Sequence, residues 1–175
     1  MSGKGKALLI TGAGGYLGAG LAARALAESE RPVILWLHAR SRAELEEKSS
    51  RLAAVLGADG ARAAFRGGDL SSDEPFADIE PHEIGAIVHA AAVTRFNVER
   101  EAAEAVNVNG ARRLFELAAR CPALDHLLLL SSVYAAGLRG GCIAETPLAE
   151  PPAFANHYEW SKWRAERTLV DEHGC

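Results

Sequence analysis

Thr11-Gly12-Ala13-Gly14-Gly15-Tyr16-Leu17-Gly18 is the stretch of this 175-residue sequence that decides the fold. It follows a short apolar run from Lys6 to Thr11, which predicts a buried strand. It precedes a segment in which Leu17, Leu21 and Ala25 recur every four residues, and this spacing predicts a helix with the three side chains on its apolar face. The glycine cluster therefore joins a strand to the first turn of a helix.

Three glycines of this stretch, Gly12, Gly15 and Gly18, are spaced three residues apart. The first allows a tight turn, the second lets the backbone approach a pyrophosphate, and the third permits close packing of the helix on the strand. The start of the helix supplies free N–H groups and the positive end of the helix dipole for the phosphates. We therefore expect a dinucleotide site whose loop residues are Gly12, Gly14, Gly15, Tyr16, Leu17 and Gly18.

The rest of the chain alternates between apolar runs and periodic helical segments. Further strands are expected at Val33–Leu37, Ala61–Arg66, Ile84–Ala90 and His126–Leu130, and helices at Ser41–Leu56, Val98–Arg120 and Tyr158–Asp171. Ser41 is the expected N-cap of its helix, with Glu44 in the capping-box position. This strict alternation implies right-handed βαβ crossovers, and so an α/β fold with a doubly wound parallel Rossmann sheet and helices on both faces. The aliphatic run His126–Leu130 is typical of the centre of such a sheet.

The number of strands limits what this domain can contain. A two-half dinucleotide fold needs about six strands, whereas only five are expected here, and the chain ends one helix after the fifth. We therefore expect one domain, residues 1–175, that is an NAD(P)-binding Rossmann domain truncated after the fifth strand and following helix. Most of any substrate lobe would be absent.

Composition excludes several classes of protein. The sequence is 49% hydrophobic and 24% charged, as is usual for a soluble globular protein, and its net charge of −4 gives no support for nucleic-acid binding. No apolar run approaches the roughly 18 residues that a membrane span needs, and no signal peptide is recognisable. The cysteines (Cys121, Cys142 and Cys175) and the six histidines show no metal-binding spacing. We expect a cytoplasmic protein with reduced thiols and no metal site.

The residues at the end of the second strand indicate the choice of cofactor. A site for NAD usually has an acidic residue about 20 residues after the glycine loop, which binds the ribose hydroxyls. Here Trp36-Leu37-His38-Ala39-Arg40-Ser41-Arg42 has no carboxylate and two guanidinium groups. Arg40 could hold a 2′-phosphate bidentately, with Ser41 or Arg42 assisting. The sequence therefore predicts NADPH, with NAD as the alternative if these arginines only solvate the start of a helix.

Tyr158-Glu159-Trp160-Ser161-Lys162 places a phenol and an ammonium four residues apart on one face of a helix. The pKa of a free tyrosine is about 10, and a nearby cation lowers it toward the range where proton transfer is easy. The pair indicates a reductase in which NADPH delivers hydride to a carbonyl carbon and Tyr158 protonates the oxygen. Lys162 would tune Tyr158 and bond the nicotinamide ribose.

These motifs together resemble the short-chain dehydrogenase/reductase superfamily, whose glycine loop reads T-G-x-x-G-x-x-G, over nearly the whole chain. Two serines lie at the end of the fifth strand, and only one can face the site because strand side chains alternate. The resemblance implies that it is Ser132, five residues before Gly137, and that it hydrogen-bonds the substrate oxygen. It also implies that Asn107 anchors a proton-relay water near the lysine. Tyr134, a second phenol, has no lysine at the matching position and is expected to pack.

The same resemblance assigns two segments to the cofactor. Gly68-Asp69-Leu70 corresponds to the motif after the third strand, which implies that the Asp69 side chain and the Leu70 backbone meet the adenine. Ala90 and Ala91 correspond to the small-residue turn that the cofactor passes closely. His89, which precedes this turn, is expected to be packed or hydrogen-bonded rather than to bind a metal.

Asn156 to Glu166 resembles the extended branch of the superfamily, in particular thioester reductases and fatty acyl-CoA reductases, whose pattern is close to N-x-Y-x-x-S-K-W-x-A-E. The resemblance implies an NADPH-dependent oxidoreductase that acts on a small-molecule or carrier-bound acyl substrate. Relatives often pair through their fourth and fifth helices, so a homodimer is possible. The alternatives are an NAD-dependent sugar-nucleotide epimerase, dehydratase or hydroxysteroid-type dehydrogenase of the same branch, a non-catalytic nucleotide sensor, and a folded but inert fragment.

Overall fold

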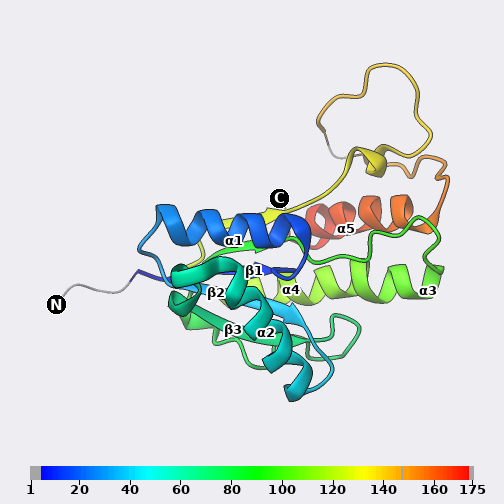
Figure 1. Ribbon diagram of the computed structural model, residues 1–175. Coiled ribbons are helices and arrows are strands. Elements are labelled where there is room, and N and C mark those ends of the chain that lie inside the picture. Colours follow the sequence, from blue (N-terminus) through cyan, green and yellow to red (C-terminus); the bar gives the residue numbers. More distant parts are fainter. Residues whose placement is uncertain (1–4, 147, 174–175) are drawn as a thin grey trace.

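Five parallel strands form one sheet, in the order β3-β2-β1-β4-β5, in the computed structural model (Figure 1). The structure describes residues 5–146 and 148–173. The strands are β1 (Ala7–Thr11), β2 (Val33–His38), β3 (Ala63–Gly68), β4 (Ile84–His89) and β5 (His126–Leu129). The predicted doubly wound α/β fold is confirmed. Because the order reverses between β1 and β4, the ligand crevice of such a fold lies at the carboxyl ends of these two strands.

Helices cover both faces of this sheet (Figure 1). One face carries α1 (Tyr16–Glu28) and α2 (Arg42–Leu56), and the other carries α4 (Gly110–Ala119) and α5 (His157–His173). The remaining elements are α3 (Arg100–Ala103), the π-helical turn η3 (Glu104–Asn109), and the 3₁₀ turns η1 (Gly57–Arg62), η2 (Pro81–Glu83) and η4 (Val133–Ala136). None of the described helices is long and apolar enough to cross a membrane.

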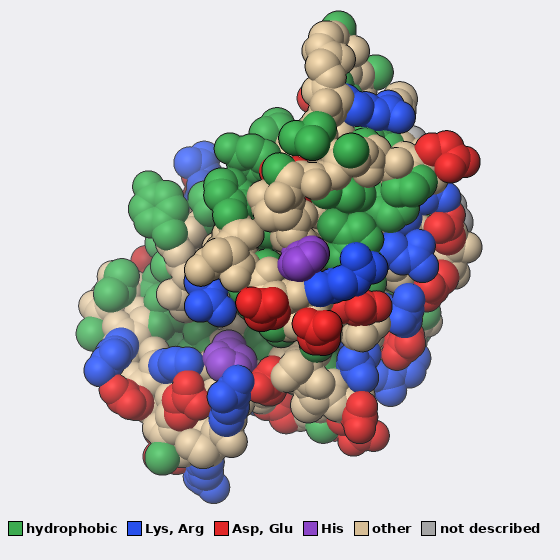
Figure 2. Space-filling view, turned by 90° about the vertical axis from the view of Figure 1, so that its right-hand side faces the viewer, with side chains coloured by type: hydrophobic (Ala, Val, Ile, Leu, Met, Phe, Trp, Pro, Cys, Tyr) green, Lys and Arg blue, Asp and Glu red, His purple; other side chains and the backbone are tan. Residues whose placement is uncertain are grey.

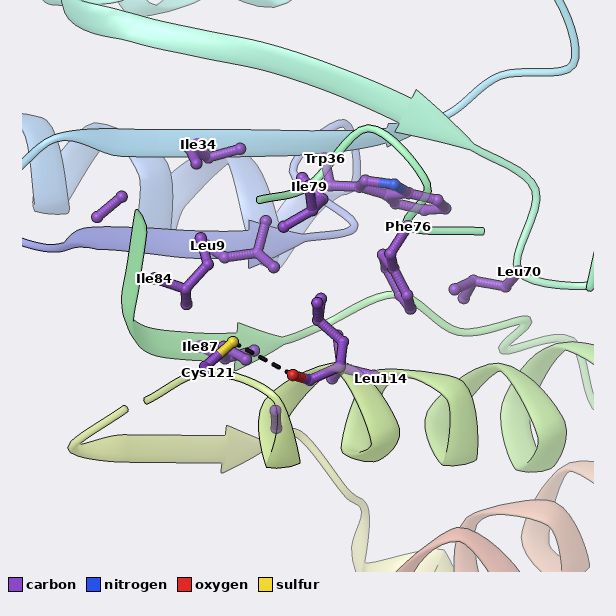
Figure 3. Packing of buried hydrophobic residues seen from close by; sticks show 13 residues of the cluster. Leu9, Ile34, Trp36, Leu70, Phe76, Ile79, Ile84, Ile87, Leu114 and Cys121 are labelled. Carbon is purple, nitrogen blue, oxygen red and sulfur yellow. Dashed lines mark hydrogen bonds between the residues drawn. The ribbon is translucent and has the colours of Figure 1, made fainter. Parts of the chain in front are cut away.

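The core on the α4 face is built around Trp36, which is fully buried (Figure 3). Its ring packs on Phe76 with centroids 5.4 Å apart, and its indole nitrogen donates to the Pro75 carbonyl at 3.1 Å. Leu9 of β1 and Leu114 of α4 belong to the same cluster. Each such side chain contributes about 1.5–3 kcal/mol when it is buried. The segment after β3 therefore packs on the sheet and fixes where the Asp69 loop begins.

The apolar face of α1 differs from the one predicted. The buried residues are Gly18, Ala22 and Leu26, whereas Leu17 is 61% exposed and its partners at 21 and 25 are only half-buried. The reason is the close approach of the helix to the glycine loop, since a Cβ on Gly18 would overlap the Gly12 carbonyl. Gly18 and Ala22, which have the smallest side chains, therefore face the sheet near the loop. The buried face of α1 is offset by about one residue from the predicted apolar face.

The predicted position of the fifth strand is wrong in one respect. β5 lies at the edge of the sheet and not at its centre, and Leu128 is 54% exposed. Its inward side chains, Leu127 and Leu129, pack on α4 and α5, and this one-sided burial explains these two leucines but not the exposed Leu128 between them. β3 also begins two residues later than expected, because residues 57–62 form the turn η1.

The helical segment expected at Val98–Arg120 is interrupted. It begins at Arg100, ends at Ala119, and contains the π turn η3 between α3 and α4. π turns insert one extra residue per turn and occur often at functional sites. The turn places Asn107 inward, where it is buried.

Candidate nucleotide and catalytic site

The glycine loop combines a crowded inner side with an open outer side. Gly12 has φ of 70°, a left-handed conformation that favours glycine, and a Cβ there would lie 2.6 Å from the Ala91 nitrogen. The Gly15 N–H donates to the Gly12 carbonyl at 2.9 Å and closes the turn. By contrast, Gly14, Gly15 and the neighbouring Tyr16 and Leu17 are exposed at the carboxyl edge of the sheet. A pyrophosphate could therefore reach the backbone from the outer side.

The turn after β4 is bound to this loop through Thr11. The Thr11 hydroxyl lies 2.7 Å from His89 Nδ1 and accepts a hydrogen bond from the Ala91 N–H at 3.3 Å. A hydroxyl can donate one hydrogen bond and accept two, so Thr11 can pair with either tautomer of a neutral imidazole while it accepts from Ala91. Burial, together with the charge of Lys162, lowers the pKa of His89 to about 3. His89 is thus a neutral, hydrogen-bonded histidine, as predicted, and it holds the two sides of the crevice together.

Burial of neutral His89 makes stability depend on pH. The folded-state pKa lies below the ordinary histidine value of 6.5, so the unfolded chain binds the proton first and stability is lost as pH falls from about 6.5 toward 3. We expect the free energy of unfolding to fall by about 2 kcal/mol between about pH 7 and about pH 5. Urea denaturation at a series of pH values measures this. A His89→Gln variant should lack this slope, and an equal slope in the variant would contradict the assignment.

The end of β2 and the loop after β3 bring the predicted Arg40 and Asp69 into direct contact. Arg40 Nε donates to Asp69 Oδ2 at 3.0 Å. A cavity of about 450 Å³ lies between the glycine loop, β2 and α2, and Arg40 and Asp69 do not line it. Its lining includes three basic side chains that were not predicted from the sequence: His38, Lys48 and Arg51. The lysine and the second arginine lie ten and thirteen residues after the strand, at helical spacing, which was the signal available in the sequence. Leu70 follows Asp69 and is buried.

Tyr158 and Lys162 lie one turn apart on α5, whose start is well defined. Asn156 is its cap, because its Oδ1 accepts from the Glu159 N–H at 3.0 Å while the Glu159 carboxylate accepts from the Ala155 N–H at 2.9 Å. Lys162 Nζ donates to the Leu130 carbonyl, just after β5, at 2.6 Å. Burial lowers the pKa of Lys162, and the charge of Glu166 partly opposes this. The ammonium is therefore held between α5 and the carboxyl end of the sheet.

Asn107 binds other groups of the protein with its whole carboxamide. Its Oδ1 accepts from the Val93 N–H at 2.8 Å, and its Nδ2 donates to the Val93 carbonyl at 2.9 Å and to Ser161 Oγ at 2.9 Å. The Ser161 hydroxyl donates in turn to the Tyr158 carbonyl at 2.8 Å. Asn107 thus ties the segment after β4 to the helix that carries Tyr158. The water-anchoring role expected of it stays a prediction.

Ser132 lies at the start of η4, in an extended conformation. Its Oγ accepts from the Tyr134 N–H at 3.2 Å, so it caps this turn. It also lines a cavity of about 780 Å³ between β5, the loop after η4 and the second half of α5, which Tyr158 and Lys162 do not line. The structure brings Ser132 to the carboxyl edge without a direct contact to Tyr158, so its catalytic role stays a prediction.

Phe96 is a further residue at this edge that the sequence analysis missed. Its ring lies 5.7 Å from that of Tyr158 and 5.2 Å from that of Tyr134, centroid to centroid, although it is 53% exposed. Tyr134 therefore packs against an aromatic neighbour, as expected. Figure 2, which faces the carboxyl edge, shows hydrophobic side chains gathered over the upper half of this surface and charged side chains mixed below them.

The described residues contain no group of three or more His, Cys, Asp or Glu side chains that could hold a metal ion. Cys121 is a buried free thiol and Cys142 an exposed one, and Cys175 lies outside the described residues.

The model of the male sterility protein family matches residues 10–174, which include the glycine loop and the Tyr158–Lys162 pair. The chain belongs to this family. The chain is therefore an NAD(P)-binding domain of the extended short-chain dehydrogenase/reductase type. The resemblance to thioester reductases is confirmed. No curated protein matches the chain.

Solved structures agree with the male sterility assignment. The terminal R domain of the myxalamid PKS-NRPS biosynthetic pathway is similar with a TM-score of 0.79 and 26% identity, over 98% of this chain and 46% of that one. A thiolation-reductase di-domain from an archaeal non-ribosomal peptide synthetase has a TM-score of 0.76 at 20% identity, over 95% and 48%. The UDP-glucuronic acid 4-epimerase of Bacillus cereus with NAD has 0.70 at 20% identity, over 96% and 52%. The chain spans about half the length of these structures, and the last two show the fold alone.

Proposed function

We propose that this chain is the NADPH-binding, proton-donating part of a reductase for carrier-bound or CoA-bound acyl thioesters. One arrangement supports the proposal above all: the glycine loop, Arg40 and the Tyr158–Lys162 pair come from separate segments and reach one edge of the sheet. Thr11, at the start of the loop, bonds to His89. The His89 carbonyl accepts from the Leu130 N–H at 3.0 Å, and the Leu130 carbonyl accepts from Lys162 Nζ at 2.6 Å. The nucleotide loop and the catalytic helix are therefore neighbours.

The residues present fit a dinucleotide. A Cβ at Gly12 or Gly18 would collide with backbone. Gly14 and Gly15 are exposed to solvent, and a Cβ on either would still lie only 3.3 Å from a neighbouring atom. The first turn of α1 contains no acidic side chain. Bound NADPH would supply the hydride. Tyr158 then donates its hydroxyl proton to the substrate oxygen, and Lys162 holds positive charge beside it and binds the nicotinamide ribose. Ser132 would orient the substrate oxygen by a hydrogen bond.

Nucleotide titration followed by intrinsic tryptophan fluorescence tests the cofactor choice. We expect NADPH to bind about tenfold or more tightly than NADH, because a charge-assisted, bidentate phosphate contact is among the strongest polar contacts. Arg40→Ala should remove this preference and leave NADH binding nearly unchanged. Arg24→Ala, at an exposed arginine of α1 that pairs with Glu28, is the control. A preference that survives Arg40→Ala would show that another group reads the phosphate, and failure of both nucleotides to bind would defeat the proposal.

Turnover of an acyl thioester and of a panel of simple ketones, followed by loss of NADPH absorbance, tests the reaction. Thioester reduction is the expected activity because of the similarity to the terminal R domain. Nucleotide binding without any turnover would instead favour a nucleotide-binding module that needs further polypeptide for catalysis. Three predictions from the sequence accompany this proposal. They are a cytoplasmic location, an incomplete domain over residues 1–175, and pairing of two copies through α4 and α5.

A further inference from the structure

Asp69 has its carboxylate oxygens already bound by neighbouring protein groups. Oδ1 accepts from the Ser71 N–H at 2.9 Å and from the Ser71 hydroxyl at 2.6 Å. Oδ2 accepts from Arg40 Nε at 3.0 Å and lies 3.6 Å from His38 Nε2. Partial burial raises the pKa of Asp69, but the hydrogen bonds from Ser71 and Arg40 outweigh this and hold the pKa well below its usual range. Both oxygens of the carboxylate therefore already accept hydrogen bonds from the protein, and the group is anchored before any ligand binds.

Arg40 is fixed at two points and free at its tip. Its backbone N–H donates to Glu44 Oε2 at 2.8 Å, and its Nε donates to Asp69. The two terminal nitrogens have no hydrogen-bond partner among the residues that the structure describes, and the side chain is 75% exposed. A guanidinium held by Nε retains terminal N–H groups that can bind two oxygens of one phosphate.

The other basic side chains nearby have partners of their own. Lys48 Nζ donates to the His38 carbonyl at 2.7 Å and to Glu44 Oε1 at 2.6 Å, and Arg51 pairs with Glu47. Arg42 is held in the same way, with its Nε donating to Glu46 Oε1 at 2.9 Å. Arg40 is thus one of two guanidinium groups after β2 whose terminal donors are available to a ligand, and it is the one that Asp69 holds.

From these contacts we propose that Asp69 is a positioning residue that orients Arg40 toward the 2′-phosphate of NADPH, rather than a ligand of the adenine. The inference rests on the proposed function, since it presumes an NADPH site at this edge. Asp69 holds one edge of the Arg40 guanidinium before the ligand binds. Phosphate binding then costs less side-chain conformational entropy than it would for a free arginine. Asp69 therefore contributes to the choice between NADPH and NADH, although its own charge would repel a phosphate.

Equilibrium binding of NADPH and NADH to an Asp69→Asn variant tests this role without any need for turnover. We expect NADPH affinity to fall about tenfold, since a charged anchor becomes a neutral one, and NADH affinity to change by less than about twofold. In an Arg40→Ala background, Asp69→Asn should have no further effect on NADPH, because the two residues act as one unit. Arg40→Lys keeps the charge but cannot be held through Nε, and it should lose NADPH affinity similarly.

The alternatives give different results. Equal losses of NADPH and NADH affinity would identify Asp69 as an adenine ligand, and tighter NADPH binding would show that repulsion dominates; either result overturns the inference. A thermal melt checks the folding of each variant, and exposed Arg40→Lys gives an independent test if Asp69→Asn is unstable. Failure of the unaltered chain to prefer NADPH would instead refute the proposed cofactor, so the two failures are distinguishable.

Discussion

A Tyr158→Phe variant should bind NADPH as the unaltered chain does and lose about 10²- to 10⁴-fold in turnover, the range that a positioned general acid contributes. The ring is buried against Val98 and Ala103 and contacts Phe96, so phenylalanine fits the same space. Only the hydroxyl that would protonate the substrate oxygen is removed. Turnover with NADPH and an acyl thioester, alongside fluorescence titration of NADPH, measures both quantities.

Tyr134→Phe is the matched control for this experiment. Tyr134 is a second phenol at the same edge, it packs on the same Phe96 ring, and it has no ammonium one helical turn away. We expect its turnover to stay within about twofold, because a phenol without a positioned role contributes little. Equal losses in the two variants, or a parallel loss of NADPH affinity in Tyr158→Phe, would argue against Tyr158 as the proton donor.

Most of the fold was predictable from the sequence, because buried parallel strands read as continuous apolar runs and glycine clusters mark their ends. The predicted β1, β2 and β4 lie within about one residue of the observed strands. The face of α1 was not predictable from its leucines. The close approach of Gly18 to the Gly12 carbonyl decides that face, and no spacing of apolar side chains reports it.

The π turn was invisible in the sequence for a different reason. The segment around Asn107 has ordinary helical periodicity, so it predicts an uninterrupted helix. The observed register depends on hydrogen bonds that Asn107 forms with Val93 and with Ser161, which are 14 and 54 residues away in the chain. Local propensity contains no information about such partners.

The candidate site was predictable residue by residue but not as a set of contacts. The motifs identified Arg40 and Asp69 separately, each with a different part of the cofactor. Their hydrogen bond joins residues 29 positions apart, and only the folded loop after β3 reveals it. Similarly, the sequence identified His89 as packed but could not indicate that it binds Thr11 and so connects the two sides of the crevice.

Gly18→Ala should destabilise the fold by about 1–3 kcal/mol, the usual cost of overpacking, and also weaken nucleotide binding. The added Cβ would overlap the Gly12 carbonyl and lie 2.9 Å from the Ala13 Cα. Both contacts are backbone, which cannot rotate away as a flexible side chain can. To relieve them α1 must move away from the loop, and the N–H groups at its start, which would bind the pyrophosphate, must move with it.

Gly20→Ala, two residues further along the same helix, should have the opposite effect. A Cβ there would have no heavy atom within 4 Å, so alanine gains helix propensity without a clash and should stabilise the fold by about 0.5–1 kcal/mol. Urea denaturation of both variants, with NADPH titration of each, compares the two positions directly. Destabilisation by both would indicate that α1 does not tolerate any added side chain near its start. Opposite signs would instead support the close contact between Gly18 and Gly12 as the feature that sets the nucleotide loop against its helix.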